Sequence, residues 1–138
     1  MRRHKATVAL VAWTLLVWTT RIGNIWRDAD LDTGDKVGRT GLALSFTVLA
    51  IGVAVALWRG SERARLVTVA ALAGWSTAVW VVRDARILLA NHEGGFKVVH
   101  TVLAVVSVVL SVLAWREARR AAAGPPAGTA DRTYAPTA

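Results

Sequence analysis

Two arginines within long apolar stretches are the residues of this chain best suited to binding chemistry. Arg21 follows Trp18 by three positions, and Arg83 follows Trp80 by the same interval, so on a helix each guanidinium would share a face with an indole ring. This spacing allows a cation–π contact at both places. An ionisable side chain at membrane depth usually faces a partner or a cavity. The pair therefore indicates a basic pocket for a phosphate, a carboxylate or a lipid head group.

Other polar residues lie near this pair in the sequence. Asn24 comes one turn after Arg21, Asp84 and Arg86 come just after Arg83, and Lys36, Lys97 and His100 open the next apolar segments. Together with the two arginines they form the candidate set for an anionic ligand or lipid. Lys36 with Lys97, and Arg39 with His100, are expected to face the arginine pair. The alternative, favoured by positions near the ends of the apolar stretches, is that the arginines are interfacial anchors beside belt tryptophans.

His100 is a candidate ligand of a different kind. It shares a helical face with Ala104, Ser107 and Ser111, which predicts a buried, hydrogen-bonded histidine that faces the other helices. Haem or metal ligation would need a second histidine at the same depth, and His92 is the one candidate. A substrate contact or a role in proton relay is the remaining alternative.

A cluster of acids follows the first apolar stretch. Asp28, Asp30 and Asp32 resemble the start of a calcium loop, and clustered carboxylates suit hard cations. The pattern departs from an EF-hand, because Gly34 stands seventh where the sixth position needs glycine, and Arg39 stands where the loop needs a bidentate glutamate. The cluster is thus a weak calcium candidate, and a solvated loop that caps the next helix is the commoner arrangement.

Several catalytic classes lack their residues here. The chain has no cysteine, which excludes thiol catalysis, disulfides and thiolate-ligated metals. No carboxylate lies in the middle of an apolar stretch, and no nucleophile–base pair, phosphate loop or dinucleotide motif occurs. We therefore predict a protein that is not an enzyme and carries no cofactor.

The elements that must position these residues are long apolar segments. Of the 138 residues, 54% are hydrophobic and 19% charged, and the apolar residues gather into four blocks separated by charge. Their length predicts membrane-spanning helices over residues 6–26, 40–58, 66–88 and 98–115, because about 20 apolar residues cross the hydrocarbon. The predicted fold is all-α, a polytopic four-helix transmembrane bundle over residues 1–120. Residues 121–138, rich in alanine, glycine and proline, are predicted to form a disordered cytoplasmic tail.

The distribution of charge predicts the orientation. With the N-terminus inside, ten lysines and arginines fall in the inner segments and seven in the outer loops, whereas six of the nine acids fall outside. Both termini are therefore expected in the cytoplasm, with the protein in the inner (plasma) membrane. The net charge of +8 is explained by this asymmetry and by anionic lipid, without a nucleic-acid partner.

The chain also resembles itself. A shift of 62 positions places Trp13, Trp18 and Arg21 on Trp75, Trp80 and Arg83. A shift of 61 then places the segment that starts at Lys36 on the one that starts at Lys97. We interpret this as a tandem duplication of a helical hairpin, which gives a parallel repeat about an axis along the membrane normal.

The function predicted from these features is non-catalytic: an accessory or scaffold subunit with an outer basic cluster for anionic lipid. Stripes of small residues such as Ala70, Gly74 and Ala78 would serve helix packing, a homo-oligomer or a larger membrane complex. A small transporter or channel subunit for an anionic or amphipathic solute is the alternative. A haem or quinone redox protein is a weaker one.

Overall fold

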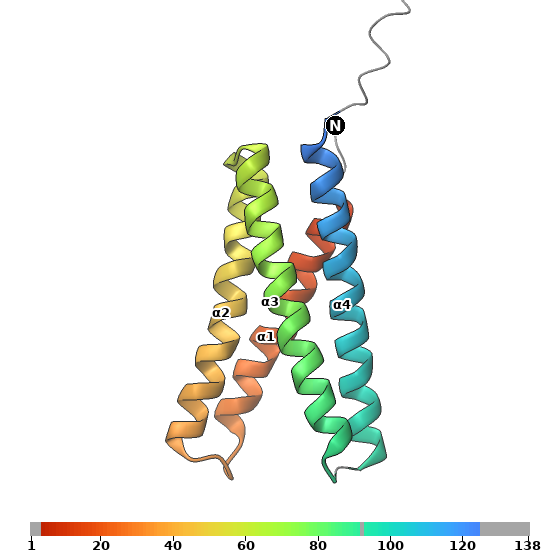
Figure 1. Cartoon of the computed structure of the whole chain (residues 1–138). Coiled ribbons are helices and arrows are strands. Elements are labelled where there is room, and N and C mark those ends of the chain that lie inside the picture. Colours follow the sequence, from red (N-terminus) through yellow and green to blue (C-terminus); the bar gives the residue numbers. More distant parts are fainter. Residues whose placement is uncertain (1–3, 92, 125–138) are drawn as a thin grey trace, which may run out of the picture.

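The computed structural model describes residues 4–91 and 93–124, which form four antiparallel α-helices (Figure 1). They are α1 (Lys5–Arg27), α2 (Thr33–Arg59), α3 (Glu62–Leu89) and α4 (Gly94–Ala122). Each helix packs against the next in the chain, and α4 packs back against α1. All four are long and apolar enough to cross a membrane, as the sequence predicted. Of the tail predicted to be disordered over 121–138, Ala121 and Ala122 belong to α4, and the residues from position 125 onward lie outside the described ones.

The helices begin before the apolar blocks do, and in α2 and α3 a polar side chain caps the first turn. The carboxylate of Asp32 accepts a hydrogen bond from the backbone N–H of Asp35 at 2.8 Å, and Ser61 does the same for Ala64 at 3.2 Å. The acidic segment before α2 thus caps the helix, as the sequence indicated. The first turns are polar extensions of the apolar spans, so each helix is longer than the span predicted for it.

The bundle has two unlike ends. The two-loop end carries the connections 28–32 and 90–93, and the one-loop end carries the two-residue connection 60–61 together with His4 and Ala123. At the one-loop end, Gly60 makes the turn between α2 and α3. A Cβ atom at this position would lie 2.5 Å from the carbonyl oxygen of Ala56, so the close approach requires glycine.

The most tightly packed core lies in the half of the bundle near the one-loop end. Leu10, Val53, Leu72 and Ala114 are fully buried there, one from each helix. Toward the middle of the bundle Phe46 stacks on Trp18 with ring centroids 4.0 Å apart. The indole of Trp80 lies 6.0 Å from that of Trp18 and completes this aromatic layer.

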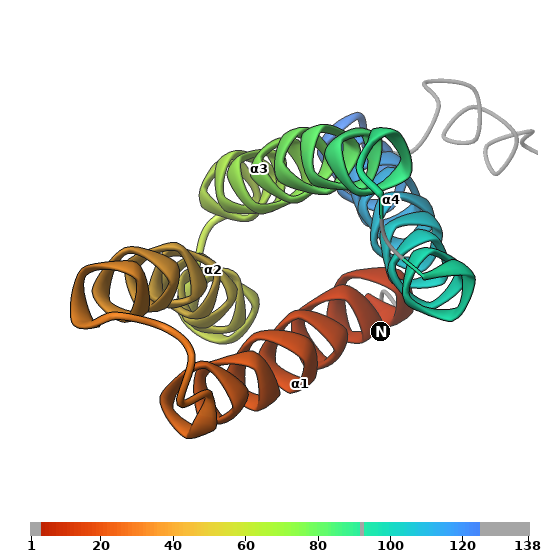
Figure 2. The same cartoon turned by 90° about the horizontal axis from the view of Figure 1, so that it is seen from below.

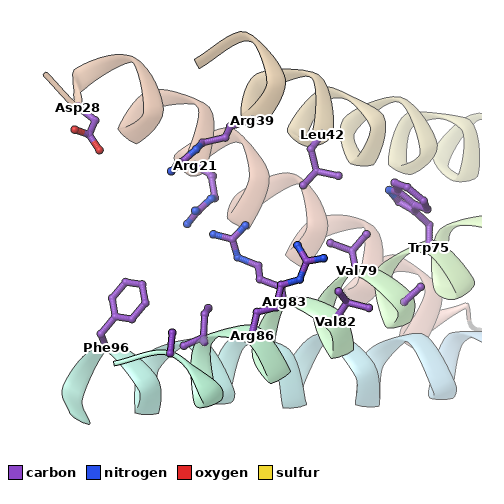
Figure 3. A pocket seen from close by; sticks show the side chains of 13 residues that line it. Arg21, Asp28, Arg39, Leu42, Trp75, Val79, Val82, Arg83, Arg86 and Phe96 are labelled. Atoms are coloured by element: carbon purple, nitrogen blue, oxygen red, sulfur yellow. The ribbon is translucent and has the colours of Figure 1, made fainter. Parts of the chain in front are cut away.

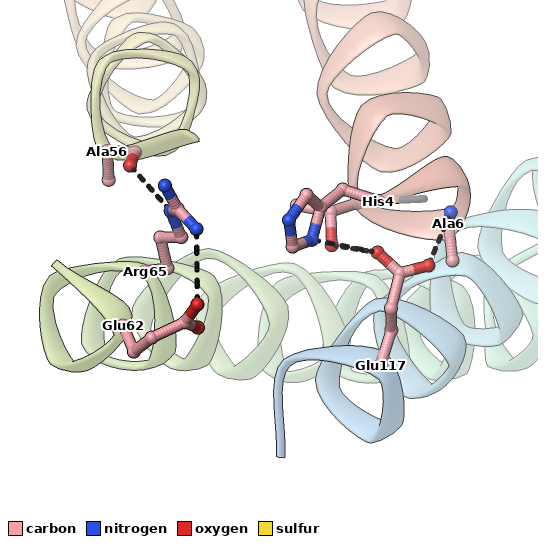
Figure 4. A network of polar contacts seen from close by, with 7 residues as sticks. His4, Ala6, Ala56, Glu62, Arg65 and Glu117 are labelled. Atoms are coloured by element: carbon pink, nitrogen blue, oxygen red, sulfur yellow. Dashed lines mark hydrogen bonds and ion pairs between the residues drawn. The ribbon is translucent and has the colours of Figure 1, made fainter. Parts of the chain in front are cut away.

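Hydrogen bonds connect the two hairpins in the middle of the bundle and at the one-loop end. In the middle, the indole N–H of Trp13 donates to Ser107 at 2.9 Å, and that of Trp75 donates to Ser45 at 3.0 Å. At the one-loop end, Glu117 of α4 accepts hydrogen bonds from the backbone N–H of Ala6 and from the hydroxyl of Thr7 (Figure 4).

The half near the two-loop end is looser. Figure 1 shows that the hairpin of α1 and α2 diverges from the hairpin of α3 and α4 toward this end, and Figure 2 shows the space between them from below. The side-chain bonds between helices in this half join α3 to α4: Thr101 donates to Asp84, and Lys97 donates to the carbonyl of Leu88. Among the described residues, none of the hydrogen bonds at this end connects the two hairpins.

Large apolar side chains cover the outside of the bundle. Val48 is 66% exposed, Leu16 62% and Val98 63%, and exposed valines, leucines and isoleucines occur on all four helices. A bundle in water would carry charged and polar residues on this face. The outer surface is therefore of the kind that suits a hydrocarbon environment.

The two hairpins bury the same faces of their helices. Six buried positions of α1 recur in α3, each 62 residues later: Thr7 and Val69, Leu10 and Leu72, Val11 and Ala73, Thr14 and Ser76, Trp18 and Trp80, Ile25 and Ile87. Four buried positions of α2 recur in α4, each 61 residues later: Ala43 and Ala104, Phe46 and Ser107, Ala50 and Ser111, Val53 and Ala114.

Candidate functional site

A cleft of about 880 Å³ opens between the diverging hairpins near the two-loop end. Four arginines from three helices line it: Arg21 from α1, Arg39 from α2, and Arg83 and Arg86 from α3. Figure 3 shows their side chains extending into the same space. We call this hollow the arginine cleft.

The helix geometry gives the cleft a polar part and an apolar part. α3 runs toward the two-loop end, so Trp75 and Val79 lie deeper in the bundle than Arg83, and Leu42 of α2 faces them. The aromatic layer of the core lies farther from the two-loop end than the arginines do. The cleft therefore offers cationic groups near its mouth and an apolar wall beneath them, which suits a ligand with an anionic head and an apolar body.

The charge in the cleft is not balanced by the protein. Asp28 is the one acid that lines it, and Arg39 pairs at 3.6 Å with Asp35 on the exposed surface of α2. Among the described residues, Arg21, Arg83 and Arg86 form no ion pair. Guanidinium groups in a partly buried cleft repel one another, and an anion between them removes that repulsion.

The structure brings together some of the predicted site residues. Arg21, Arg83 and Arg86 share the arginine cleft. Asn24 and His100 lie in a smaller adjoining pocket that Arg21 and Arg83 also line. The two arginines thus point into common space and do not splay outward separately, which is the arrangement that a binding site would need.

Three of the predicted residues line neither the cleft nor the adjoining pocket. Asp84 was expected beside Arg83, yet its carboxylate accepts a hydrogen bond from Thr101 at 3.0 Å and lines an apolar groove between α3 and α4. Lys97 donates to the carbonyl of Leu88 and so closes the α3–α4 connection. Lys36, in the first turn of α2, does not line the cleft either. These residues are near the arginines in sequence, but the helical twist directs their side chains to another face of the helix.

The cation–π contacts that the spacing allowed are not formed among the described residues. Trp18 and Trp80 are buried in the aromatic layer, and no described guanidinium lies over either ring. Cation–π pairs occur in the described residues at the opposite end: Arg59 lies 4.7 Å from the ring of its neighbour Trp58, and Arg119 lies 5.8 Å from that of Trp115.

His100 is buried, as predicted, at 8% exposure. Its Nδ1 lies 2.9 Å from the carbonyl oxygen of Phe96, one turn earlier, so Nδ1 carries the proton and donates. The candidate second ligand, His92, lies outside the described residues. The other described histidine, His4, lies at the one-loop end near Glu117.

Carboxylates of the acidic loop accept hydrogen bonds from nearby backbone N–H groups. Asp28 accepts a hydrogen bond from the N–H of Asp30, and Asp32 caps α2. Across residues 4–91 and 93–124, no three carboxylates or histidines are grouped closely enough to hold a metal ion. Asp28, Asp30 and Asp32 are therefore not arranged as a calcium site.

Sequence reasoning missed the polar cluster around Glu117. This carboxylate binds the first turn of α1 through Ala6 and Thr7, and His4 lies 3.7 Å away. The signal was the lone acid among Arg116, Arg119 and Arg120, since an acid in a basic segment often has a specific partner. Comparison of the chain with family models, with curated proteins and with solved structures finds no match.

Proposed function

We propose that this chain is a multi-pass protein of the plasma membrane with both termini in the cytoplasm. The apolar outer surface and the four long helices support insertion. The one-loop end carries the arginine-rich segments around Arg59 and Arg119, whereas most acids belong to the two-loop end, and this asymmetry supports a cytoplasmic one-loop end.

Cysteine labelling tests the orientation, because the chain has no native thiol. In intact cells, a membrane-impermeant maleimide should label Asp32→Cys and Gly95→Cys. Ser61→Cys, the matched control at the one-loop end, should react only after the membrane is permeabilised. The reverse pattern would place the two-loop end in the cytoplasm.

We also infer that the two hairpins arose by tandem duplication. The recurrence of the buried positions at a constant offset supports this, because chance resemblance between apolar helices would not reproduce which faces are buried. The paired hydrogen bonds of Trp13 and Trp75 to serines of the other hairpin support it as well. Arg21 and Arg83 are then equivalent residues near one axis.

The function that the geometry supports best is that of a non-catalytic membrane subunit that binds an anionic lipid. The observation that carries this proposal is the arginine cleft, in which four guanidinium groups from three helices face one space with Asp28 as the single acid. The apolar wall beneath them matches the chains of a lipid, and the arginines match its head group.

Lipid binding by the purified full chain in detergent tests this proposal. Native mass spectrometry should show that phosphatidic acid binds in preference to phosphatidylcholine. The double variant Arg21→Ala/Arg83→Ala should weaken phosphatidic acid binding by about 100-fold, the loss expected for two charge-assisted hydrogen bonds. An excess of inorganic phosphate distinguishes the sources of the anion, because it should displace the lipid only if phosphate alone is the ligand.

The matched control is Arg59→Ala/Arg119→Ala, which removes the same charge at the one-loop end. It should leave phosphatidic acid binding unchanged. Equal binding of both lipids, or an equal loss in the control variant, would contradict the proposal.

The second candidate is a small transporter for an anionic amphiphile. The observation that favours it is that Arg21 and Arg83 line two hollows, one on each side of the axis that relates the hairpins. Flux of a fluorescent anionic amphiphile into proteoliposomes, abolished in Arg21→Ala, would favour this function over binding alone.

A further inference from the structure

Arg21 and Arg83 line two hollows. Besides the arginine cleft, they line a pocket of about 280 Å³ formed mainly by α1, with two residues each from α3 and α4, which we call the minor pocket. Trp13 and Leu103 supply part of its apolar wall, and His100 lies among its polar members. The arginine pair is therefore a boundary shared by two spaces.

The minor pocket repeats the arginine cleft at the offsets of the two hairpins. Residues of equivalent position line both: Trp13 and Trp75, Leu103 and Leu42, His100 and Arg39. Arg21 and Arg83 exchange places under the same relation. The two hollows are thus related by the axis that relates the hairpins, and they differ in charge, since Asn24 and His100 stand where the cleft has Arg86 and Arg39.

Both hollows have the same order of polarity along the helices. In α1, Trp13 and Val17 precede Arg21, and α1 runs toward the two-loop end. In α3, Trp75 and Val79 precede Arg83 in the same way. Each hollow is therefore apolar in its deeper part and leads outward to the same two guanidinium groups.

We infer that the ligand is one two-chained anionic phospholipid that straddles the arginine pair; this inference rests on the proposed function. Its phosphate lies between Arg21 and Arg83, one acyl chain lies in the arginine cleft, and the other lies in the minor pocket. The shared arginines explain why a single head group serves both hollows. The surplus positive charge of Arg39 and Arg86 draws the phosphate toward the larger one.

The number of acyl chains on the lipid provides the test. For the unmodified full chain in detergent, native mass spectrometry should give one bound phosphatidic acid per protein. Its affinity should exceed that of single-chained lysophosphatidic acid of the same acyl length by at least about tenfold, the effect of burying roughly two more methylene groups. Both lipids carry the same head group, so the difference isolates the second chain.

A pair of variants assigns that chain to the minor pocket. Thr20→Trp adds an indole to its wall, where Thr20 is exposed, and should reduce the tenfold preference to less than twofold. Thr19→Trp is the matched control, since Thr19 is exposed but lines neither hollow, and the preference should remain.

The outcomes separate this inference from the proposed function. Three outcomes would overturn the inference of a straddling lipid and leave anionic lipid binding intact. They are equal affinity for phosphatidic acid and lysophosphatidic acid, two lipids bound per protein, and an unchanged preference in Thr20→Trp. Failure of both lipids to bind better than phosphatidylcholine would overturn the proposed function itself. Because the first measurement uses the unmodified protein, it decides even if the Thr20→Trp variant does not fold.

Discussion

The two halves of the bundle use the same four helices in opposite ways. Near the one-loop end, Leu10 and Leu72 are fully buried and Glu117 joins α4 to α1. Near the two-loop end the hairpins separate, and the space between them holds Arg21, Arg83 and Arg86, which form no ion pair in the described part of the chain. Tight packing and the proposed lipid site are thus separated along the helix axis, so substitutions in one half should leave the property of the other half nearly intact.

The largest effect should come from the aromatic layer between the halves. Phe46→Ala removes a fully buried ring that stacks on Trp18, and it should lower the free energy of unfolding by about 3–5 kcal/mol. Thermal unfolding in detergent, followed by tryptophan fluorescence, measures the loss. Val48→Ala, on the exposed face of the same helix, is the control and should change little. A loss below about 1 kcal/mol in Phe46→Ala would show that the aromatic layer contributes little to the stability of the bundle.

A smaller effect should come from the polar cluster at the one-loop end. Glu117→Ala leaves the N–H of Ala6 and the hydroxyl of Thr7 without their acceptor and should cost about 2 kcal/mol. Hydrogen exchange in the first turn of α1 should accelerate accordingly. Glu62→Ala, which removes only an exposed pair with Arg65, should cost less than about 0.5 kcal/mol. Similar losses in the two variants would contradict the assignment of Glu117 as the link between α1 and α4.

The two indole hydrogen bonds sharpen the comparison between the hairpins. Ser45 also donates to the carbonyl of Leu42, so Trp75→Phe leaves it with a partner and should cost about 0.5 kcal/mol. Ser107 is buried, and Trp13 is the one hydrogen-bond partner of its Oγ in the described part of the chain, so Trp13→Phe should cost about 1–2 kcal/mol. Chemical denaturation of both variants measures the difference. Equal costs would mean that the Ser107 Oγ finds another hydrogen-bond donor.

The smallest effect on stability should come from the mouth of the cleft. Arg39→Gln removes an exposed ion pair with Asp35 and should change the free energy of unfolding by less than about 0.5 kcal/mol. The same variant should weaken phosphatidic acid binding a few-fold, because it removes one of the four cleft cations. Loss of stability without loss of binding would show that Arg39 serves the fold and not the cleft.

Much of the fold could be predicted from the sequence, because apolar length and flanking charge are local properties. The four helices follow from the four apolar blocks, and Asp32 was expected to lie in a helix-capping segment. The helix ends were less predictable, since hydropathy reports where the apolar span stops and not where backbone hydrogen bonding stops. α2 therefore begins at Thr33, well before the span predicted from residue 40.

The candidate site could be predicted only in part, for a reason of geometry. Arg21 and Arg83 share a cleft, and the match of the sequence with itself at an offset of 62 pairs the same two residues. Asp84 is next to Arg83 in sequence, but one residue turns a helix by about 100°, which directs the carboxylate to Thr101. The volume of the cleft depends on how far the hairpins diverge, and no local pattern encodes that.

The turn at Gly60 sets the angle between α2 and α3, and the length of α3 amplifies any change in that angle. α3 has 28 residues and is therefore about 42 Å long at 1.5 Å per residue. Each degree of tilt between α2 and α3 at this turn displaces the far end of α3 by about 0.7 Å, by the geometry of a rod of that length. A side chain at position 60 would collide with the backbone at Ala56, and such a collision acts on the helix angle. A substitution at position 60 would thus change the distance between the arginines of the two hairpins from the opposite end of the molecule.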